Sequence, residues 1–210
     1  MAMRFVLQHL YLVCAAALFT MIFGLILGAA AYLCKPLRAM ILGLVDILQT
    51  IPVLAMLGII MLFFGATSTT VIIGIVLYSL LPMVRNTYTG LENVNPGIKE
   101  AAQGMGMTKW QRLLKIELPL AFPIIFTGLR IAIVTSIGIA VFGAVVGGGG
   151  LGSTINRAIL IQDMNTLMQA TFTLMAMAMI FDFGMSYMEK RLQARGQSFR
   201  SRGAGNGSQG

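Results

Sequence analysis

Residues 100–119 read EAAQGMGMTKWQRLLKIELP and lie in a polar stretch, residues 85–120, that separates two long apolar runs. A connection of this length usually has structure or function of its own. The small pair Ala101-Ala102 permits close backbone approach by a partner, and Gly106 permits a sharp turn that a side chain would block. The stretch predicts a helical hairpin that docks on another protein, the alternative being an amphipathic surface hairpin without a partner.

Two start signals predict where the helices of this hairpin begin. Asn95 followed by Pro96 is typical of a helix start, because Asn caps a helix and Pro fits its first turn. Thr108, with Gln111 three residues later, predicts a capping box at the start of a second helix. We expect Gly104 and Gly106 to end the first helix.

The apolar runs around this stretch predict membrane-spanning helices, because about 20 apolar residues cross the hydrocarbon core of a bilayer. Hydrophobic residues make up 57% of the chain and charged residues 10%, whereas a soluble domain carries about 25% charged residues. The mean hydropathy is +0.84. The sequence predicts an all-α integral membrane protein with one domain over residues 5–192. Its five spans are expected at about 10–34, 41–64, 69–84, 121–146 and 167–188.

The placement of lysine and arginine predicts the orientation of these spans. All of the 15 basic residues except Arg4, Arg130 and Arg157 fall on one side when the carboxy terminus is placed inside. Cytoplasmic loops carry an excess of such residues. We therefore expect the amino terminus outside, and the carboxy terminus and residues 85–120 in the cytoplasm. The first run is too long for a cleaved signal peptide, and the tail, residues 193–210, is expected to be disordered.

Several function classes are disfavoured by the residues present. The net charge of +8 belongs to short loops between apolar runs, so it does not indicate a nucleic-acid-binding face. Cys14 and Cys34 lie roughly 30 Å apart on one predicted helix, too far for a disulfide, and no metal-ligand spacing exists. The run from Gly104 to Lys109 lacks the spacing of a phosphate-binding loop. We expect no catalytic residue, no metal site and no cofactor in this chain.

The hairpin resembles the inner-face motif of the permease subunits of ATP-binding-cassette (ABC) importers. That motif is Glu-Ala-Ala, three residues, Gly, nine residues, Ile, one residue, Leu-Pro, and this chain matches it with Glu100, Ala101, Ala102, Gly106, Ile116, Leu118 and Pro119. The resemblance implies the type I importer permease fold, with five core helices. It also implies that the hairpin forms coupling helices that insert into a groove on a separate ATPase subunit.

Other segments resemble the permeases for glycine betaine, carnitine and choline. They are residues 49–52, 81–88, 104–108, 117–120, 128–130, 147–152 and 188–192. The resemblance implies a bacterial cytoplasmic membrane protein that imports a quaternary ammonium osmoprotectant and is not itself an enzyme. The implied partners are a pair of ABC ATPase subunits that use ATP, an extracytoplasmic substrate-binding protein, and a second copy or a paralogous permease.

Two residues within the spans are candidates for the transport path or its gate. Pro52 interrupts the second span, and the backbone carbonyls it frees either line the path or belong to a packing kink. Arg130 lies within the fourth span, where a charge is a functional candidate by default. A structural or topological role is the alternative for Arg130, including a bridge from the hairpin to the bundle.

Two other classes of transporter remain open alternatives. A permease of another small type I importer, for methionine or other amino acids, shares the five spans and the hairpin motif. An ion-coupled secondary transporter would be indicated by charges at the membrane midplane and by inverted repeats. Neither feature is evident in the sequence, and that class leaves the hairpin motif unexplained.

Overall fold

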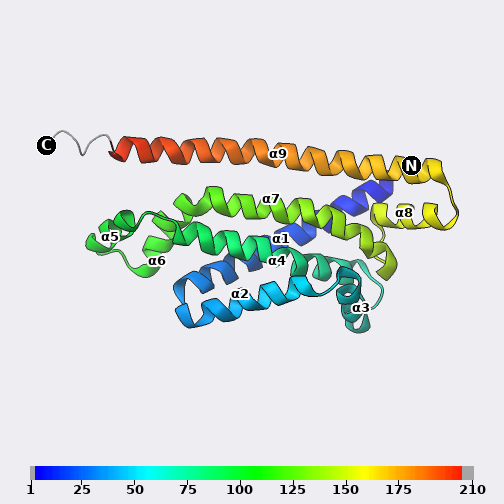
Figure 1. Ribbon diagram of the computed structural model, residues 1–210, viewed down its shortest axis with the longest axis horizontal. Helices are drawn as coiled ribbons and strands as arrows, with labels where there is room; N and C mark the ends of the chain where they lie inside the picture. The colour runs from blue at the N-terminus through cyan, green and yellow to red at the C-terminus, as the bar shows by residue number, and fades with distance from the viewer. Residues whose placement is uncertain (1–2, 205–210) are drawn as a thin grey trace.

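The computed structural model describes the backbone of residues 3–204 and the side chains of residues 3–192. Over that range the chain is helical and contains no strand, which confirms the predicted all-α class. The helices run in chain order as follows: α1 Met3–Leu33, α2 Lys35–Thr50, α3 Val53–Phe64, α4 Ser68–Glu92, α5 Pro96–Gly104, α6 Lys109–Arg112, the π-helical turn η1 Leu113–Glu117, α7 Leu118–Phe142, the 3₁₀ turn η2 Gly143–Val146, α8 Gly150–Leu160 and α9 Met164–Ala204 (Figure 1).

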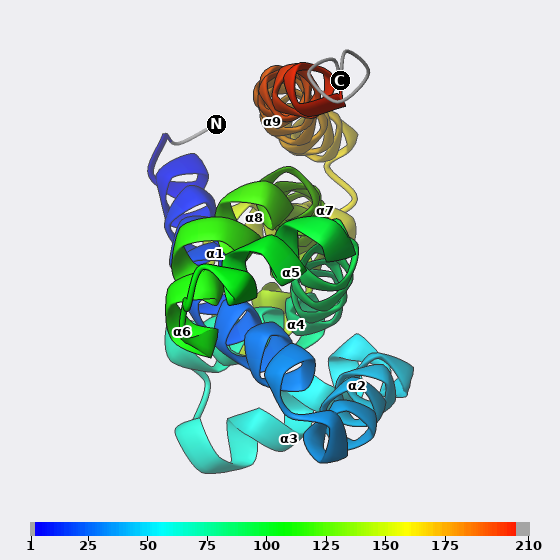
Figure 2. The same cartoon turned by 90° about the vertical axis from the view of Figure 1, so that its left-hand side faces the viewer.

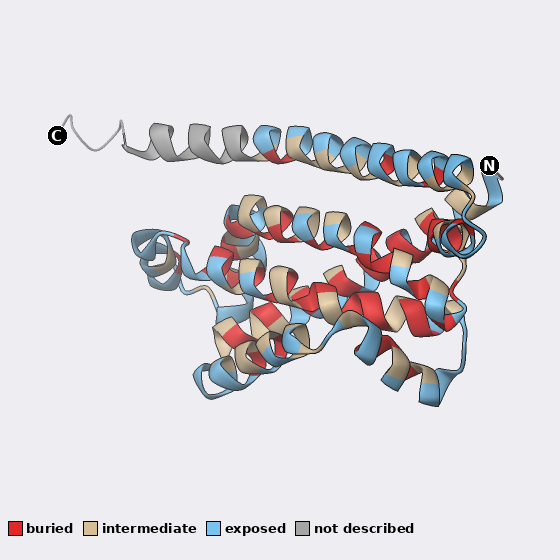
Figure 3. Cartoon of the chain, turned by 45° about the vertical axis from the view of Figure 1, so that its right-hand side comes forward, coloured by how far each residue is buried: buried red, intermediate tan, exposed pale blue. Residues whose placement is uncertain are grey.

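The helices α1, α4 and α7 form the centre of the molecule. Both α1 and α7 pack along α4, and small residues bring the axes close: Gly24 of α1 leaves no room for a Cβ atom beside Met83 of α4. On one side α9 lies against α7, and on the other α2 and α3 lie against α4 (Figure 2). Buried residues concentrate in the central helices, whereas α9 is mostly exposed (Figure 3).

The second expected span, residues 41–64, is broken rather than continuous. The helices α2 and α3 meet at an angle of 101°, because Pro52 has no backbone N–H to continue the hydrogen bonding of α2. Tyr78 of α4 stabilises the break: its hydroxyl donates to the carbonyl of Ile51 at 3.0 Å, and Gln49 Nε2 donates to the carbonyl of Tyr78 at 2.9 Å. In the described part of the chain four helices are long and apolar enough to span a membrane, and the bent pair, taken as one span, completes the predicted five.

The third span extends further than expected. We expected helix to give way to the polar stretch at residue 85, but α4 continues to Glu92. Thr87 and Leu91 in this last part are fully buried, and Arg85 forms an ion pair with Asp46 of α2 at 2.6 Å. Contacts with other helices therefore keep these residues helical, although the hydropathy pattern alone predicts that the span ends near residue 84.

Two further elements differ from the sequence-based expectation. Gly150–Leu160 forms the short helix α8, which was not predicted because it begins directly after a run of glycines, which disfavour helix, and is too short to span a membrane. Its buried residues are Gly150, Leu151, Gly152 and Ala158. The expectation of disorder from residue 193 is wrong as far as Ala204, since α9 remains helical to that residue. Leu192 and residues 193–195 are good helix formers. The remainder of that tail, residues 205–210, lies outside the described part of the chain.

Candidate functional site

The hairpin of α5 and α6 stands at one end of the bundle (Figure 1), and its two start signals are confirmed. Asn95 caps α5, since its side-chain oxygen accepts from the backbone N–H of Gly97 at 2.8 Å. Thr108 and Gln111 form the capping box of α6: Thr108 Oγ1 accepts from the Gln111 N–H at 3.3 Å, and Gln111 Oε1 accepts from the Thr108 N–H at 2.9 Å.

Gly106 makes the turn between the two helices. Its φ is +78°, a conformation that side-chain-bearing residues adopt at a cost and β-branched residues adopt poorly. No atom lies within 4 Å of where a Cβ would be built. The requirement for glycine here is therefore one of backbone conformation and not of space.

The hairpin exposes several large apolar side chains. Met105 is 72% exposed, Trp110 65% and Leu114 59%. Large exposed apolar side chains that lie together mark interaction surfaces. Glu100 and Ala101 are also exposed on the hairpin. Together these residues provide a surface suited to another protein.

Other residues of the motif face the bundle. Ala102 is 1% exposed, so of the pair Ala101-Ala102 only Ala101 is available to a partner. Ile116 and Leu118 are half-buried at the base of the hairpin, and Pro119 is exposed. The motif thus includes residues that face outward and residues that anchor the hairpin to the spans.

A buried ion pair lies at the base of the hairpin and was not predicted. Arg112 Nε donates to Glu117 Oε1 at 2.6 Å, and the Glu117 side chain is 1% exposed. The π-helical turn brings the two together; within it the Leu118 N–H donates to the carbonyl of Leu113, five residues back. No standard helix signal marks this pair, because Arg112 and Glu117 are five residues apart, whereas side chains on an α-helix meet at spacings of three or four.

The two candidates for the path or gate lie outside the hairpin and in different spans. Pro52 lies at the break between α2 and α3. Arg130 forms ion pairs with Asp182 at 2.7 Å and Glu189 at 3.0 Å, and both partners belong to α9. These ion pairs join α7 to α9 and not to the hairpin, and a role of Arg130 in the path or gate stays a prediction.

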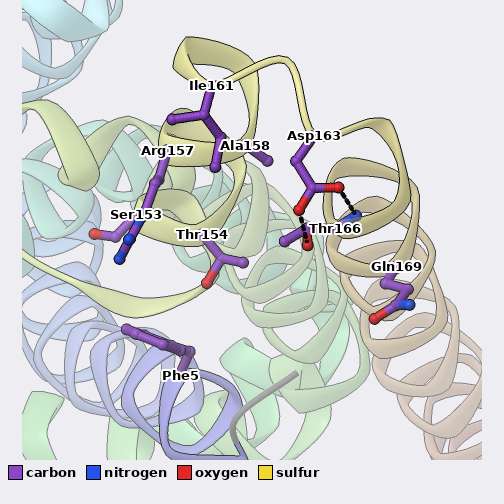
Figure 4. Close-up of a pocket in the computed structure, with 9 residues that line it drawn as sticks. All are labelled: Phe5, Ser153, Thr154, Arg157, Ala158, Ile161, Asp163, Thr166 and Gln169. Carbon is purple, nitrogen blue, oxygen red and sulfur yellow. Dashed lines mark hydrogen bonds between the residues drawn. The ribbon is translucent and has the colours of Figure 1, made fainter.

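A cavity of about 470 Å³ lies at the opposite end of the bundle, between α1, α8 and α9 (Figure 4). Phe5, Arg157 and Gln169 are among its lining residues. Asp163 at its edge caps α9, because its two oxygens accept from the hydroxyl and the backbone N–H of Thr166 at 2.6 and 3.1 Å. These hydrogen bonds lower the pKa of Asp163 below its ordinary value. Among the described residues no cluster of His, Cys, Asp or Glu could hold a metal ion.

A bundle with a broken second span and a projecting hairpin is the arrangement expected above for an importer permease. Residues 20–194 match the family of binding-protein-dependent transport system inner membrane components. The chain belongs to this family of ABC permeases.

Relatives of this chain include permeases named for osmoprotectants and for glycine betaine, carnitine and choline. The chain is 37% identical to the osmoprotectant import permease protein OsmW of Salmonella typhimurium, over 90% of each chain. It is 39% identical to the glycine betaine/carnitine/choline transport system permease protein OpuCD of Bacillus subtilis, over 88% of this chain and 81% of the relative.

Solved structures show the same fold. The methionine ABC transporter MetNI in an inward-facing conformation contains a chain that matches with a TM-score of 0.84 and 21% identity, over 90% of this chain and 95% of that one. At this level of identity the likeness speaks for the fold alone. It confirms the type I permease architecture expected from the sequence.

Proposed function

We propose that this chain translocates a small quaternary ammonium osmoprotectant of the glycine betaine, carnitine or choline class. The observation that carries the proposal is the similarity to osmoprotectant permeases along nearly the whole chain. The sequence offers no evident aromatic cage, which a quaternary ammonium ligand requires for tight binding. Substrate recognition is therefore assigned to an extracytoplasmic binding protein, and the isolated permease should bind these compounds weakly.

The hairpin is the proposed docking element for the ATPase subunits, which hydrolyse the ATP. Its exposed apolar side chains support this role, with Glu100 and Ala101 on the outward surface and Gly106 setting the turn. Ile116 is half-buried at the base of the hairpin, and Leu118 and Pro119 begin α7, so these motif residues join the hairpin to the fourth span. The permease acts as a pair, with a second copy or a paralogue, because alternating access in this design needs two halves that move against each other.

Radiolabelled uptake into liposomes tests the proposal. The permease is reconstituted with its ATPase and binding protein, and a panel of glycine betaine, carnitine, choline, methionine and other amino acids is offered. We expect ATP-dependent import of at least one quaternary ammonium compound. Import of methionine with none of the quaternary compounds would assign the chain to an amino-acid system and leave the fold unaffected. Uptake that follows an ion gradient without ATP would indicate a secondary transporter.

The orientation in the membrane is a separate part of the proposal. The amino terminus lies outside, and the hairpin and carboxy terminus lie in the cytoplasm of a bacterial inner membrane, as the basic residues predict. In a variant with Cys14 and Cys34 replaced, a cysteine at Ser153 should react with an impermeant thiol reagent added outside, and one at Asn93 should not. The opposite labelling would place the hairpin on the wrong side for an ATPase.

A further inference from the structure

Helix α1 is long enough for both of its ends to stand outside the hydrocarbon core. Its 31 residues correspond to about 46 Å at ~1.5 Å per residue, against a core of about 30 Å. It contains no proline, and it packs along α4 for much of its length. Because such a helix moves as a rigid body, a displacement of one end also displaces the other end.

The inner end of α1 contacts the first hairpin helix through Tyr32. Lys99 of α5 lies over the Tyr32 ring, with Nζ 5.0 Å from the ring centroid. The same ammonium group donates to the carbonyls of Leu91 and Glu92 at 2.9 and 3.2 Å, where a cation is favoured because the last carbonyls of a helix lack partners. Lys99 therefore fastens α5 to α1 and to the end of α4 together.

Tyr32 also interacts with the base of the second hairpin helix. Its ring carries the contact with Lys99, and its hydroxyl group interacts electrostatically with the buried carboxylate of Glu117. The carboxylate is held on its other side by Arg112, and its Oε2 atom is buried without a direct hydrogen bond. A hydroxyl group next to a buried carboxylate lowers the energy of the charged form. Tyr32 is thus the one α1 side chain in contact with charged groups of both hairpin segments, as far as the described contacts extend.

The outer end of α1 holds a different segment. Gln8 Nε2 donates to the carbonyl of Gly148 at 3.3 Å, and Gln8 Oε1 accepts from the Gly150 N–H at 3.1 Å. Gly149 and Gly150 have positive φ, and a Cβ on Gly149 would collide with the Gln8 side chain. His9 Nε2 lies 3.1 Å from the carbonyl of Ile137 of α7. The start of α1 is therefore hydrogen-bonded to the glycine-rich segment that leads into α8.

We propose that α1 links the hairpin to the glycine-rich segment across the membrane, with Tyr32 and Gln8 as the positioning residues at its two ends. The inference rests on the proposed function, in which the hairpin meets the ATPase and the opposite face meets the binding protein. A change at the ATPase surface moves Lys99 and Glu117, and these shift Tyr32. Gln8 then moves the backbone at Gly148 and Gly150, on the face that receives the substrate.

The test uses conservative variants in the assembled transporter in liposomes. Tyr32→Phe keeps the ring beneath Lys99 and removes the hydroxyl beside Glu117, and Gln8→Leu removes both hydrogen bonds to the glycine-rich segment. We expect both variants to retain the ATPase subunits and the basal rate of ATP hydrolysis. Stimulation of that rate by the binding protein loaded with glycine betaine should fall by up to about tenfold in each, the size expected when one or two polar contacts are lost. The double variant should fall no further, since the two residues act in series.

Tyr11→Phe is the matched control. Tyr11 lies on α1, is 61% exposed, and loses the same hydroxyl in the variant, so stimulation should be unchanged. Full stimulation in Tyr32→Phe and Gln8→Leu, or losses that multiply in the double variant, would overturn the linkage. Failure of the proposed function is distinct, because then the wild-type complex itself would show no stimulation by the loaded binding protein.

Discussion

Two ion pairs in this permease have the same length and very different surroundings. Arg112–Glu117 at the base of the hairpin and Arg85–Asp46 between α4 and α2 are both 2.6 Å long. The side chains of the first pair are 20% and 1% exposed, and those of the second are 56% and 42% exposed. A buried charge depends on its partner for stabilisation far more than an exposed charge does, because water can solvate the exposed one. We therefore expect burial, and not the distance between the charged atoms, to decide which pair contributes more to the stability of the fold.

The largest effect is expected from Glu117→Gln. The substitution leaves Arg112 mostly buried without its counter-charge, which costs about 3 kcal/mol in buried pairs of this kind. The midpoint of thermal unfolding of the purified permease should fall markedly, with lower levels in the membrane.

The double variant Arg112→Met/Glu117→Met is the control for this prediction. Replacing both charges by apolar side chains of similar length removes the desolvation penalty together with the attraction. Stability should recover most of the loss. If Glu117→Gln is no less stable than Asp46→Asn, burial is not what distinguishes the two pairs.

Gly106→Val, at the tip of the hairpin, tests the effect of local backbone strain at a position where no buried contact is changed. Gly106→Val places a β-branched residue at φ +78° and should cost about 1–3 kcal/mol of local backbone strain. Because no neighbour lies near the added side chain, the bundle should stay folded while co-purification of the ATPase and transport are lost. Gly104→Val is the matched control, since Gly104 also has open space around it but lacks a positive φ. Normal transport by Gly106→Val would show that the turn at Gly106 is not required for docking of the ATPase.

The smallest effect is expected from Asp46→Asn. An exposed ion pair contributes about 0–1 kcal/mol, so the unfolding midpoint should change little. Raising the salt concentration should abolish any difference from wild type, because salt screens exposed charges. A loss as large as that of Glu117→Gln would mean that this pair is covered in the assembled transporter.

The sequence predicted local features well where the signal is itself local. The caps at Asn95 and Thr108 depend on side chains two or three residues from their targets, so residue type and spacing suffice. The turn at Gly106 and the interruption at Pro52 follow in the same way from backbone chemistry. The assignment to an ABC permease came from the spaced motif and not from these rules.

The features that were missed depend on residues far apart in the chain. The continuation of α4 past residue 84 requires contacts of Thr87 and Leu91 with other helices. The burial of α8 depends on the close approach of Gly150 to His9 and of Gly152 to Val141. Orientation, ATPase docking and the roles of Pro52 and Arg130 in the path remain predictions.

The sequence by itself determined that this chain spans a membrane, where its hairpin begins and turns, and to which family it belongs. Those properties follow from hydropathy, capping and motif spacing, which act over a few residues. Only the tertiary structure decided that Glu117 is buried beside Arg112, that Arg130 joins α7 to α9, and that Tyr32 contacts both parts of the hairpin. The reason is that the energy of a charge depends on the solvent and the partners around it, and the packing of distant helices sets both.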